Sequence, residues 1–422
     1  MWTLLKSGQC SSSSQFLLEY HFQFPYLSLD CCAFVSLRND NIIVARGNVL
    51  EVYNVEILSE VGKRALTKED KVHTGLILCY SHIPHTNVVV SSGDEAITFW
   101  DGSTGCHLIT NHGDFEMHTS SPFGSLLATC GGDYQIMVWD TTTFTLVASI
   151  APQLCMEQCK DEKDYAVHED EAVQVCHIVD TGKVACGCKS GNVYHWQHYG
   201  NSNTITVGTF HTSSVEALSF SPTGDCFVSG DLKGAVAMWK PSEDSKLQVF
   251  ALESHQETVQ HICFSPDIEY CPRFVSAAWG PELYLHNCKD GNLLQKMAGH
   301  KSDIFVVKFS ASGSIVASAD SDEGLVCLWD SFTGVLLSKV PGSGRGISTI
   351  NFISSDNLLV VSDFNNMVRV YRNYTQNLQT IPKVVLPDLM GCTNASKNAD
   401  DPIIACFFGS GLVKVIKIRE CT

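Results

Sequence analysis

A short apolar stretch that ends in an aromatic residue recurs along the whole chain. The clearest examples are AITFWD at Trp100, IMVWD at Trp139 and LVCLWD at Trp329. A period of about 45 residues is typical of a module of four short β-strands, so we expect a repeat protein rather than two or three unrelated domains. With six weaker endings, at Tyr53, Trp196, Trp239, Leu285, Tyr371 and Ile416, the nine endings lie 47, 39, 57, 43, 46, 44, 42 and 45 residues apart.

Each repeat divides into short strands, most clearly the fifth. Its four apolar runs are Val215–Phe220, Cys226–Gly230, Ala235–Trp239 and Lys246–Leu252, and turn residues separate them. We find no run of a dozen residues with an apolar period of 3.6. The pattern therefore predicts an all-β chain and disfavours α/β folds.

Three repeats share a longer pattern, in which a histidine is followed four residues later by Val or Ile and five residues after that by Phe-Ser. The third copy also has Gly299 before its histidine and Asp330 after its tryptophan. This pattern resembles the WD-repeat (WD40) family, and the resemblance covers residues 30–418. It implies a single closed β-propeller. The three copies are His211, Val215, Phe220, Ser221; His255, Val259, Phe264, Ser265; and His300, Ile304, Phe309, Ser310.

The resemblance implies one four-stranded blade per repeat, hence nine blades, with eight blades and a spare hairpin as the alternative. The last repeat has apolar strands from Ile403 and Leu412 but no fourth strand. We expect the segment FLLEYHFQF, Phe16–Phe24, to supply that strand and close the last blade. The expected organisation is an N-terminal segment at 1–29, the propeller at 30–418 and a tail at 419–422.

In WD-repeat proteins a loop His, a second-strand Ser or Thr, a turn Asp and a third-strand Trp form a hydrogen-bonded tetrad that holds a blade together. Because the set recurs in several repeats, we expect its role to be structural rather than catalytic. The first, sixth, eighth and ninth repeats depart from the pattern, and apolar packing alone is expected to hold them. The resemblance assigns His112, Thr129, Asp133 and Trp139 in the third repeat; His211, Ser229 and Trp239, with Asp231 less surely in register, in the fifth; and His300, Ser318 and Trp329, with Asp320 or Asp322, in the seventh.

The widest spacing contains an insertion at about 151–172. Its acidic side chains outnumber its lysines by five, and insertions on repeat proteins often bind partners, so the insertion is a candidate partner-binding segment. The alternative is a solvated acidic loop without a partner. The acidic residues are Glu157, Asp161, Glu162, Asp164, Glu169, Asp170 and Glu171.

The same insertion holds a weak candidate metal site, Cys155, Cys159 and His168. A zinc site would need four converging ligands, and this spacing is unlike the paired C-x-x-C of a zinc finger. Downstream, Cys186 and Cys188 alternate on one strand, which core packing explains. The 19 cysteines are too few for a disulfide scaffold, so we expect mostly reduced, buried thiols, no metal and no cofactor.

Charge and motifs exclude several classes of function. The net charge is −17, and no cluster of Lys and Arg could neutralise nucleic-acid phosphates. The sequence has no stretch of about 18 apolar residues that could span a membrane, and its first residues lack the pattern of a secretory signal. We therefore expect a cytoplasmic protein, with an additional nuclear location as the alternative. No GxSxG, P-loop, HExxH or helix-opening GxGxxG motif is present, so we expect no enzyme.

The interpretation is a non-catalytic protein–protein interaction scaffold or adaptor, whose partners present basic or aromatic surfaces to its acidic one. One alternative is a substrate receptor of a ubiquitin ligase. WD-repeat proteins of that kind often carry a WDxR motif, but its Arg is missing after Trp100, Trp139 and Trp329. Another is the propeller portion of a larger signalling protein, although the initial Met and the closing strand favour a complete polypeptide. An enzyme is the last alternative, and no oligomeric state is predicted.

Overall fold

The structure, a computed structural model, is built from antiparallel β-strands. It describes residues 202–242, 246–266 and 272–341 without a break, and elsewhere between 16 and 420 it describes mainly the strands. Residues 1–15, 19–40, 55–76 and 151–172 lie outside the described residues, as do shorter gaps between strands. Within the described part of the chain, no helix is long and apolar enough to cross a membrane.

The chain divides into two compact units. Unit 2 comprises Val72–Asp101 and His107–Ala298, and its described residues form five sheets of four strands each. These are β4 (Ile77–Ile83), β5 (Val88–Gly93), β6 (Ala96–Asp101) and β7 (His107–His112); β8 (Met117–Ser120), β9 (Leu126–Cys130), β10 (Ile136–Asp140) and β11 (Thr145–Ile150); β12 (Val173–Ile178), β13 (Lys183–Cys188), β14 (Asn192–Tyr199) and β15 (Ser202–Thr209); β16 (Val215–Phe220), β17 (Phe227–Asp231), β18 (Val236–Pro241) and β19 (Leu247–Ala251); and β20 (Val259–Phe264), β21 (Arg273–Ala278), β22 (Glu282–Asn287) and β23 (Leu293–Ala298).

Unit 1 comprises Met1–Lys71, Gly102–Cys106 and Gly299–Thr422. Its described residues form a four-stranded sheet, a five-stranded sheet, a four-stranded sheet that includes the first strand of the chain, and a two-stranded hairpin. These are β24 (Ile304–Phe309), β25 (Ile315–Asp320), β26 (Val326–Asp330) and β27 (Leu336–Val340); β28 (Ile347–Ile353), β29 (Leu358–Asp363), β30 (Met367–Arg372), β31 (Gln379–Thr380) and β32 (Val384–Val385); β1 (Phe16–Leu18), β33 (Leu389–Asn394), β34 (Ile403–Phe408) and β35 (Val413–Glu420); and β2 (Asn41–Arg46) with β3 (Val49–Asn54).

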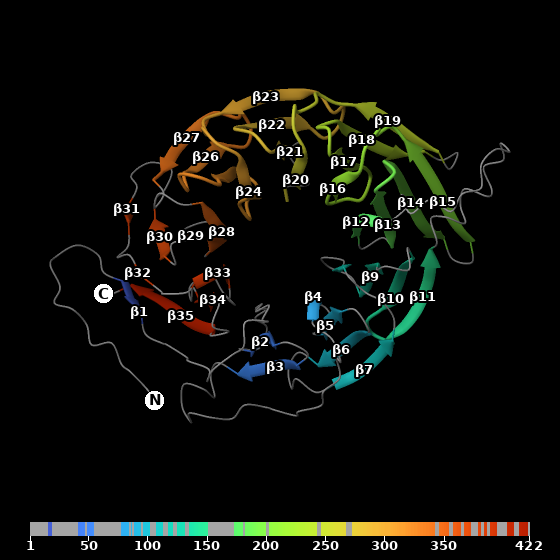
Figure 1. The fold of residues 1–422 in the computed structure, drawn as a ribbon, viewed down its shortest axis with the longest axis horizontal. Helices are drawn as coiled ribbons and strands as arrows, with labels where there is room; N and C mark the ends of the chain where they lie inside the picture. The colour runs from blue at the N-terminus through green and yellow to red at the C-terminus, as the bar shows by residue number, and fades with distance from the viewer. Residues whose placement is uncertain are drawn as a thin grey trace. The chain divides into compact units, whose positions relative to one another are not determined.

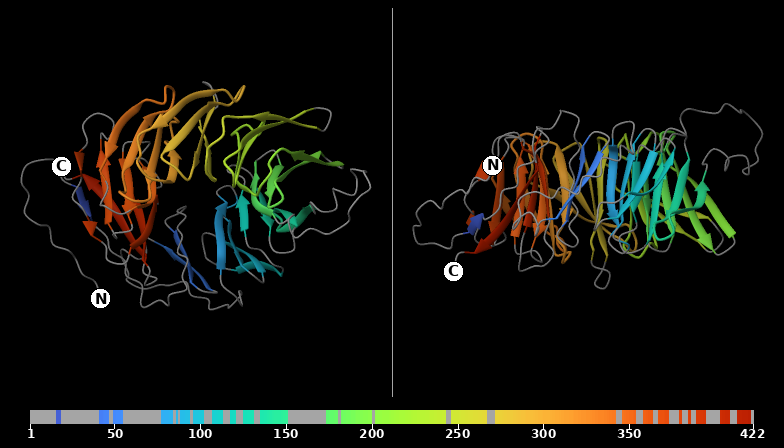
Figure 2. Two further views of the ribbon diagram at one scale, coloured as in Figure 1. Left: turned by 45° about the horizontal axis from the view of Figure 1, so that its top comes forward. Right: turned by 90° about the horizontal axis from the view of Figure 1, so that it is seen from below.

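Successive sheets pack against one another within each unit. In unit 2 the first strand of each sheet contacts the first strand of the next, as β12, β16 and β20 do, and the sheets lie beside one another in chain order, from light blue to yellow (Figure 1; Figure 2). The prediction of an all-β chain built mainly of four-stranded sheets is confirmed for the described residues, in which seven of the nine sheets have four strands.

The N-terminal strand joins the last sheet. β1 pairs antiparallel with β35, and Phe16 lies opposite Glu420 and Leu18 opposite Ile418. This is the pairing predicted for the FLLEYHFQF segment, over three of its nine residues, while residues 19–24 lie outside the described part. The first repeat is described only as the hairpin β2–β3.

The core lies between neighbouring sheets, because the second and third strands are covered on both faces. Every residue of β17 and of β21 is buried, so polar residues on these strands, such as Ser229 and Ser276, need hydrogen-bond partners inside the protein. The Phe227 ring stacks on the Trp239 indole at 6.1 Å. The fourth strands are more exposed, as in β19.

Gly230 lies where two neighbouring sheets approach each other closely. A Cβ atom at this position would lie 2.6 Å from Val259 Cβ on the next sheet. We therefore expect Gly230→Ala to lower the free energy of unfolding by about 1–3 kcal/mol through overpacking, measured by urea titration. The double variant with Val259→Ala makes room for the new methyl group and should cost less than the two single losses added together. Simple additivity of the two losses would contradict this close approach.

Candidate functional site

The fifth repeat contains a complete hydrogen-bonded tetrad. Ser229 Oγ accepts a hydrogen bond from Trp239 Nε1 at 2.7 Å and lies 2.7 Å from His211 Nε2. His211 Nδ1 lies 3.1 Å from Asp231 Oδ2. Asp231 Oδ1 accepts hydrogen bonds from the backbone N–H groups of Lys233 and Ala235, so the tetrad also holds the turn between β17 and β18.

The seventh repeat repeats this arrangement in unit 1. Ser318 Oγ accepts from Trp329 Nε1 at 2.8 Å and lies 2.7 Å from His300 Nε2. The acid is Asp320, whose Oδ2 lies 3.3 Å from His300 Nδ1, whereas Asp322 is exposed. Burial lowers the pKa of His300, as it lowers the pKa of His211, despite the nearby carboxylates.

The third repeat is described only in part. Trp139 Nε1 donates to Thr129 Oγ1 at 2.9 Å, as the resemblance implies. Asp133 and the side chain of His112 lie outside the described residues.

The sixth repeat corrects two expectations. His286 Nδ1 lies 3.2 Å from the Gly291 carbonyl oxygen, and His255 Nε2 lies 2.9 Å from Ser276 Oγ, so apolar packing alone does not hold this sheet. The residue in the tryptophan position is His286 rather than Leu285, because His286 lies opposite Phe274 as Trp239 lies opposite Phe227. A count of ten residues from the serine to the third-strand position would have found it.

The aspartate that follows the tryptophan has a function that the sequence analysis did not assign. Asp330 Oδ1 accepts hydrogen bonds from the backbone N–H groups of Phe332 at 3.0 Å and Thr333 at 2.8 Å. Asp140 does the same with Thr142 and Thr143. These carboxylates hold the turn between the third and fourth strands, which explains why Trp-Asp pairs mark these repeat ends.

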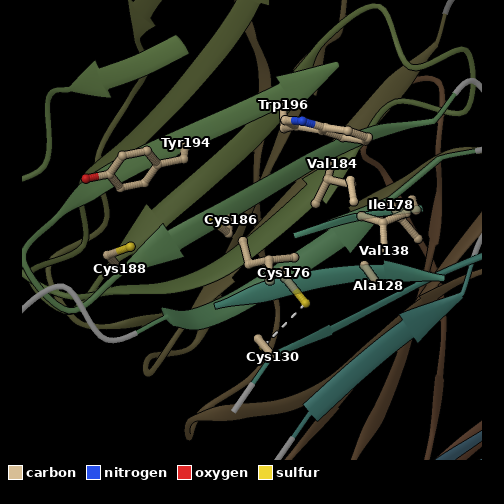
Figure 3. Close-up of a cluster of buried hydrophobic side chains, with 12 residues drawn as sticks. Ala128, Cys130, Val138, Cys176, Ile178, Val184, Cys186, Cys188, Tyr194 and Trp196 are labelled. Atoms are coloured by element: carbon tan, nitrogen blue, oxygen red, sulfur yellow. Dashed lines mark hydrogen bonds between the residues drawn. The ribbon is translucent and has the colours of Figure 1, made fainter. Parts of the chain in front are cut away.

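The fourth repeat has cysteines where the fifth has its polar tetrad residues. Trp196 lies opposite Val184 as Trp239 lies opposite Phe227, so Cys186 takes the serine position and Cys188 the aspartate position. Both are buried in one apolar cluster with Cys130 and Cys176, whose sulfur atoms lie 3.7 Å apart (Figure 3). The hydrogen bond with Cys188, together with burial, raises the pKa of the Cys186 thiol.

The candidate insertion at 151–172 lies outside the described residues. This applies to all seven acidic residues and to Cys155, Cys159 and His168. Within the described part of the chain, no group of three or more His, Cys, Asp or Glu side chains has the geometry of a metal site. His177, downstream of the insertion, accepts a hydrogen bond from the backbone N–H of Phe220.

Two large apolar side chains are exposed in equivalent turns of unit 2. Leu232 follows β17 and is 50% exposed, and Trp279 follows β21 and is 54% exposed. Thr258 connects them, since its Oγ1 donates to the Leu232 carbonyl at 2.9 Å and its carbonyl accepts from the Trp279 N–H at 3.0 Å. We call Leu232, Thr258 and Trp279 the turn surface. Neither exposed residue was singled out from the sequence, because exposure is not visible there.

A model of the family described as WD domain, G-beta repeat matches residues 109–140, 203–240 and 291–330. The chain contains WD40 repeats. The three matched WD40 repeats end at Asp140, Lys240 and Asp330, and they are the repeats in which Trp139, Trp239 and Trp329 donate hydrogen bonds to a second-strand hydroxyl.

Curated proteins with similar sequences align over limited regions. Periodic tryptophan protein 2 of Arabidopsis thaliana is 23% identical over 58% of this chain and 25% of its own length. Small ribosomal subunit protein RACK1y of Oryza sativa subsp. japonica is 26% identical over 39% of this chain and 49% of its own length. Apoptotic protease-activating factor 1 of Rattus norvegicus is 22% identical over 81% of this chain and 28% of its own length. The chain thus spans a quarter to a half of the length of these three relatives.

A solved structure has a fold similar to that of this chain. The crystal structure of the computationally designed Ika8 protein is similar to this chain with a TM-score of 0.58, at 21% sequence identity, and the match covers 82% of this chain and 98% of that one. At this identity the similarity concerns the fold alone.

Proposed function

We propose that this chain is a non-catalytic scaffold or adaptor that binds other proteins through the turn surface of unit 2. The observation that carries the proposal is the exposure of Trp279. Trp139, Trp196, Trp239 and Trp329 are all buried in their sheets, whereas Trp279 is 54% exposed and contributes little to the core. Exposed tryptophans are strongly enriched among the residues that dominate protein–protein binding energy.

The turn surface is also held in place before any partner binds. The Thr258 hydrogen bonds connect its two turns, and Leu232 N–H donates to the Ser214 carbonyl at 2.9 Å. Turns that are already ordered lose little conformational entropy on binding. This arrangement supports binding rather than catalysis, because neither of the two exposed side chains has a nucleophilic or titratable group.

Charge supports a partner with basic and apolar side chains. The chain carries a net charge of −17, and the exposed Glu257 adjoins Thr258 in the turn surface. A basic partner would be attracted to such a surface, and its association would weaken with salt. We propose the acidic insertion at 151–172 as a second contact for the same class of partner.

The proposal includes the arrangement of the WD40 repeats. The pairing of β1 with β35 supports a closed propeller, and the nine sheets of the described residues support nine blades, with the β2–β3 hairpin as the least complete. The rat relative extends far beyond the part that aligns with this chain. This favours the alternative in which the chain is the propeller portion of a larger signalling protein. We place its action in the cytoplasm or nucleus.

The test is affinity purification from cell lysate with the full chain and with Trp279→Ser, at low and high salt. We expect a defined set of proteins to be retained by the parent chain at low salt, and the variant to retain at least about 30-fold less, because a central tryptophan contributes about 2 kcal/mol or more. Leu146→Ser is the matched control, because Leu146 is 47% exposed on the outer strand β11.

Two results would contradict the proposal. One is equal retention by Trp279→Ser and the parent chain. The other is an equal loss with Leu146→Ser, which would indicate general surface stickiness rather than the turn surface. A chain in which a Gly-Ser loop replaces residues 151–172 separately tests the insertion.

A further inference from the structure

Two buried cysteines meet where two neighbouring sheets of unit 2 pack together. Cys226 lies immediately before β17, and Cys288 immediately after β22. Their sulfur atoms are 3.3 Å apart, and the two residues are 3% and 5% exposed. Both are free thiols. The pair therefore spans the interface between sheet β16–β19 and sheet β20–β23.

The backbone on both sides of this pair is held by hydrogen bonds. The Cys226 carbonyl accepts from the Ser221 N–H, and the Cys288 N–H donates to the Pro272 carbonyl, both at 2.9 Å. Formation of a disulfide needs the sulfur atoms to approach to about 2.05 Å. Because they begin at 3.3 Å, the sulfur atoms must approach one another by about 1.2 Å.

The surroundings of the two thiols make them chemically different. The hydrogen bond from Cys288 lowers the pKa of Cys226, and the Lys240 ammonium group lowers it further. The same hydrogen bond and burial raise the pKa of Cys288. Lys240 is held in place by a hydrogen bond to the Lys289 carbonyl, next to Cys288. Cys226 is thus the thiol of the pair that loses its proton more readily, and Cys288 the one that keeps its proton.

We propose that Cys226 and Cys288 are an oxidative modification site, at which a hydroperoxide converts the two thiols into a disulfide that joins the neighbouring sheets. The Cys226 thiolate attacks one oxygen of hydrogen peroxide, breaks the O–O bond and becomes a sulfenic acid, and the released hydroxide takes a proton to form water. Cys288 then attacks the Cys226 sulfur, its proton leaves with the sulfenic hydroxyl as a second water, and the S–S bond forms. Two thiols and one peroxide give one disulfide and two waters.

A second thiol pair in the same unit provides an internal comparison. Cys130 and Cys176 also bridge neighbouring sheets, but their sulfur atoms lie 3.7 Å apart within an apolar cluster. Cys226 has the shorter sulfur–sulfur distance and a nearby ammonium group. The Cys226–Cys288 pair should therefore oxidise first.

The test treats the full-length reduced chain with hydrogen peroxide, blocks the remaining thiols with an alkylating reagent and maps the peptides without reduction. We expect a peptide pair linked through Cys226 and Cys288, lighter by two hydrogen atoms than the separate peptides and separated by reductant. The midpoint of thermal unfolding of unit 2 should rise by about 5–10 °C, because the cross-link closes a loop of 62 residues along the chain.

Variants identify the partners. Cys288→Ser should abolish the linked peptide and leave Cys226 open to alkylation or further oxidation, whereas Cys263→Ser, at a partly buried cysteine outside the pair, should leave the linkage intact. The proposal is overturned if the parent chain, after peroxide, still carries alkylated Cys226 and Cys288 while other cysteines are oxidised. It is equally overturned if Cys226 is found joined to a different cysteine. Both results come from the parent chain and do not depend on the folding of a variant.

Discussion

Replacing Ser229 with alanine should lower the free energy of unfolding by about 2–4 kcal/mol. The Ser229 hydroxyl is the centre of the fifth-repeat tetrad, accepting from Trp239 Nε1 and contacting His211 Nε2, both at 2.7 Å. Alanine leaves both ring nitrogens buried without this partner, and each unsatisfied buried group costs about 1–3 kcal/mol. Urea titration followed by tryptophan fluorescence measures the loss.

An exposed serine provides the matched control. Ser149 lies on the outer strand β11, where its hydroxyl donates to Gln135 in a solvent-exposed contact, so Ser149→Ala should change the free energy of unfolding by less than about 0.5 kcal/mol. In a background of Trp239→Phe, which removes one of the two nitrogens, Ser229→Ala should cost less than it does alone. If Ser229→Ala cost no more than Ser149→Ala, the tetrad would not stabilise the sheet.

Lowering the pH from 7.5 to 5 should destabilise unit 2 strongly. Burial lowers the pKa of His195, His255 and His286 from 6.5 to about 4. The unfolded chain, with ordinary histidine pKa values, then binds more protons than the folded chain between pH 6.5 and 4. The stability is fully present above about pH 6.5 and is lost as the pH falls towards 4. At pH 5 each histidine accounts for a loss of about 2 kcal/mol.

A phenylalanine at one of these positions tests the cause. His195 stacks on Phe227 with ring centroids 5.8 Å apart, and its Nε2 is buried without a hydrogen-bond partner. His195→Phe keeps the stacked ring and removes the titrating group, so the loss between pH 7.5 and 5 should shrink by about 2 kcal/mol. Urea titrations of both proteins at both pH values give the comparison, and each protein at pH 7.5 is its own reference. Identical losses in the two proteins would contradict the assignment to His195.

The sequence predicts strands and tetrad residues correctly where their spacing along the chain is regular. Strand Val215–Phe220 was predicted with its observed bounds, because alternating apolar residues and turn residues act locally. The tetrad members of the fifth and seventh repeats could be named because their spacing is regular. The sequence could not choose between Asp320 and Asp322, because one extra residue in the β25–β26 turn changes the number of residues between the acid and the tryptophan. The hydrogen bond between Asp320 and His300 decides it.

The sixth repeat shows the opposite case. His286 takes the tryptophan position, and stacks on Phe274 with ring centroids 4.8 Å apart, because strand pairing places it there. The residue type gave no signal, since a histidine in an apolar run resembles neither a core residue nor the expected aromatic ring. The sequence places this repeat ending near Leu285, one residue before His286, and it could not choose between them although a shift of one residue moves a side chain to the other face of a strand.

The sequence by itself determined that this is an all-β repeat chain that contains WD40 repeats, that His211, Ser229 and Trp239 act together in the fifth repeat, and that an N-terminal strand pairs with the last sheet. These properties depend on short-range patterns of apolar, turn and hydrogen-bonding residues, which repeat at a fixed spacing. The tertiary structure alone decided that Trp279 is exposed while four other tryptophans are buried, and that Cys226 lies 3.3 Å from Cys288 although 62 residues separate them. Exposure and long-range contact arise only when neighbouring sheets pack, and no local pattern carries that information.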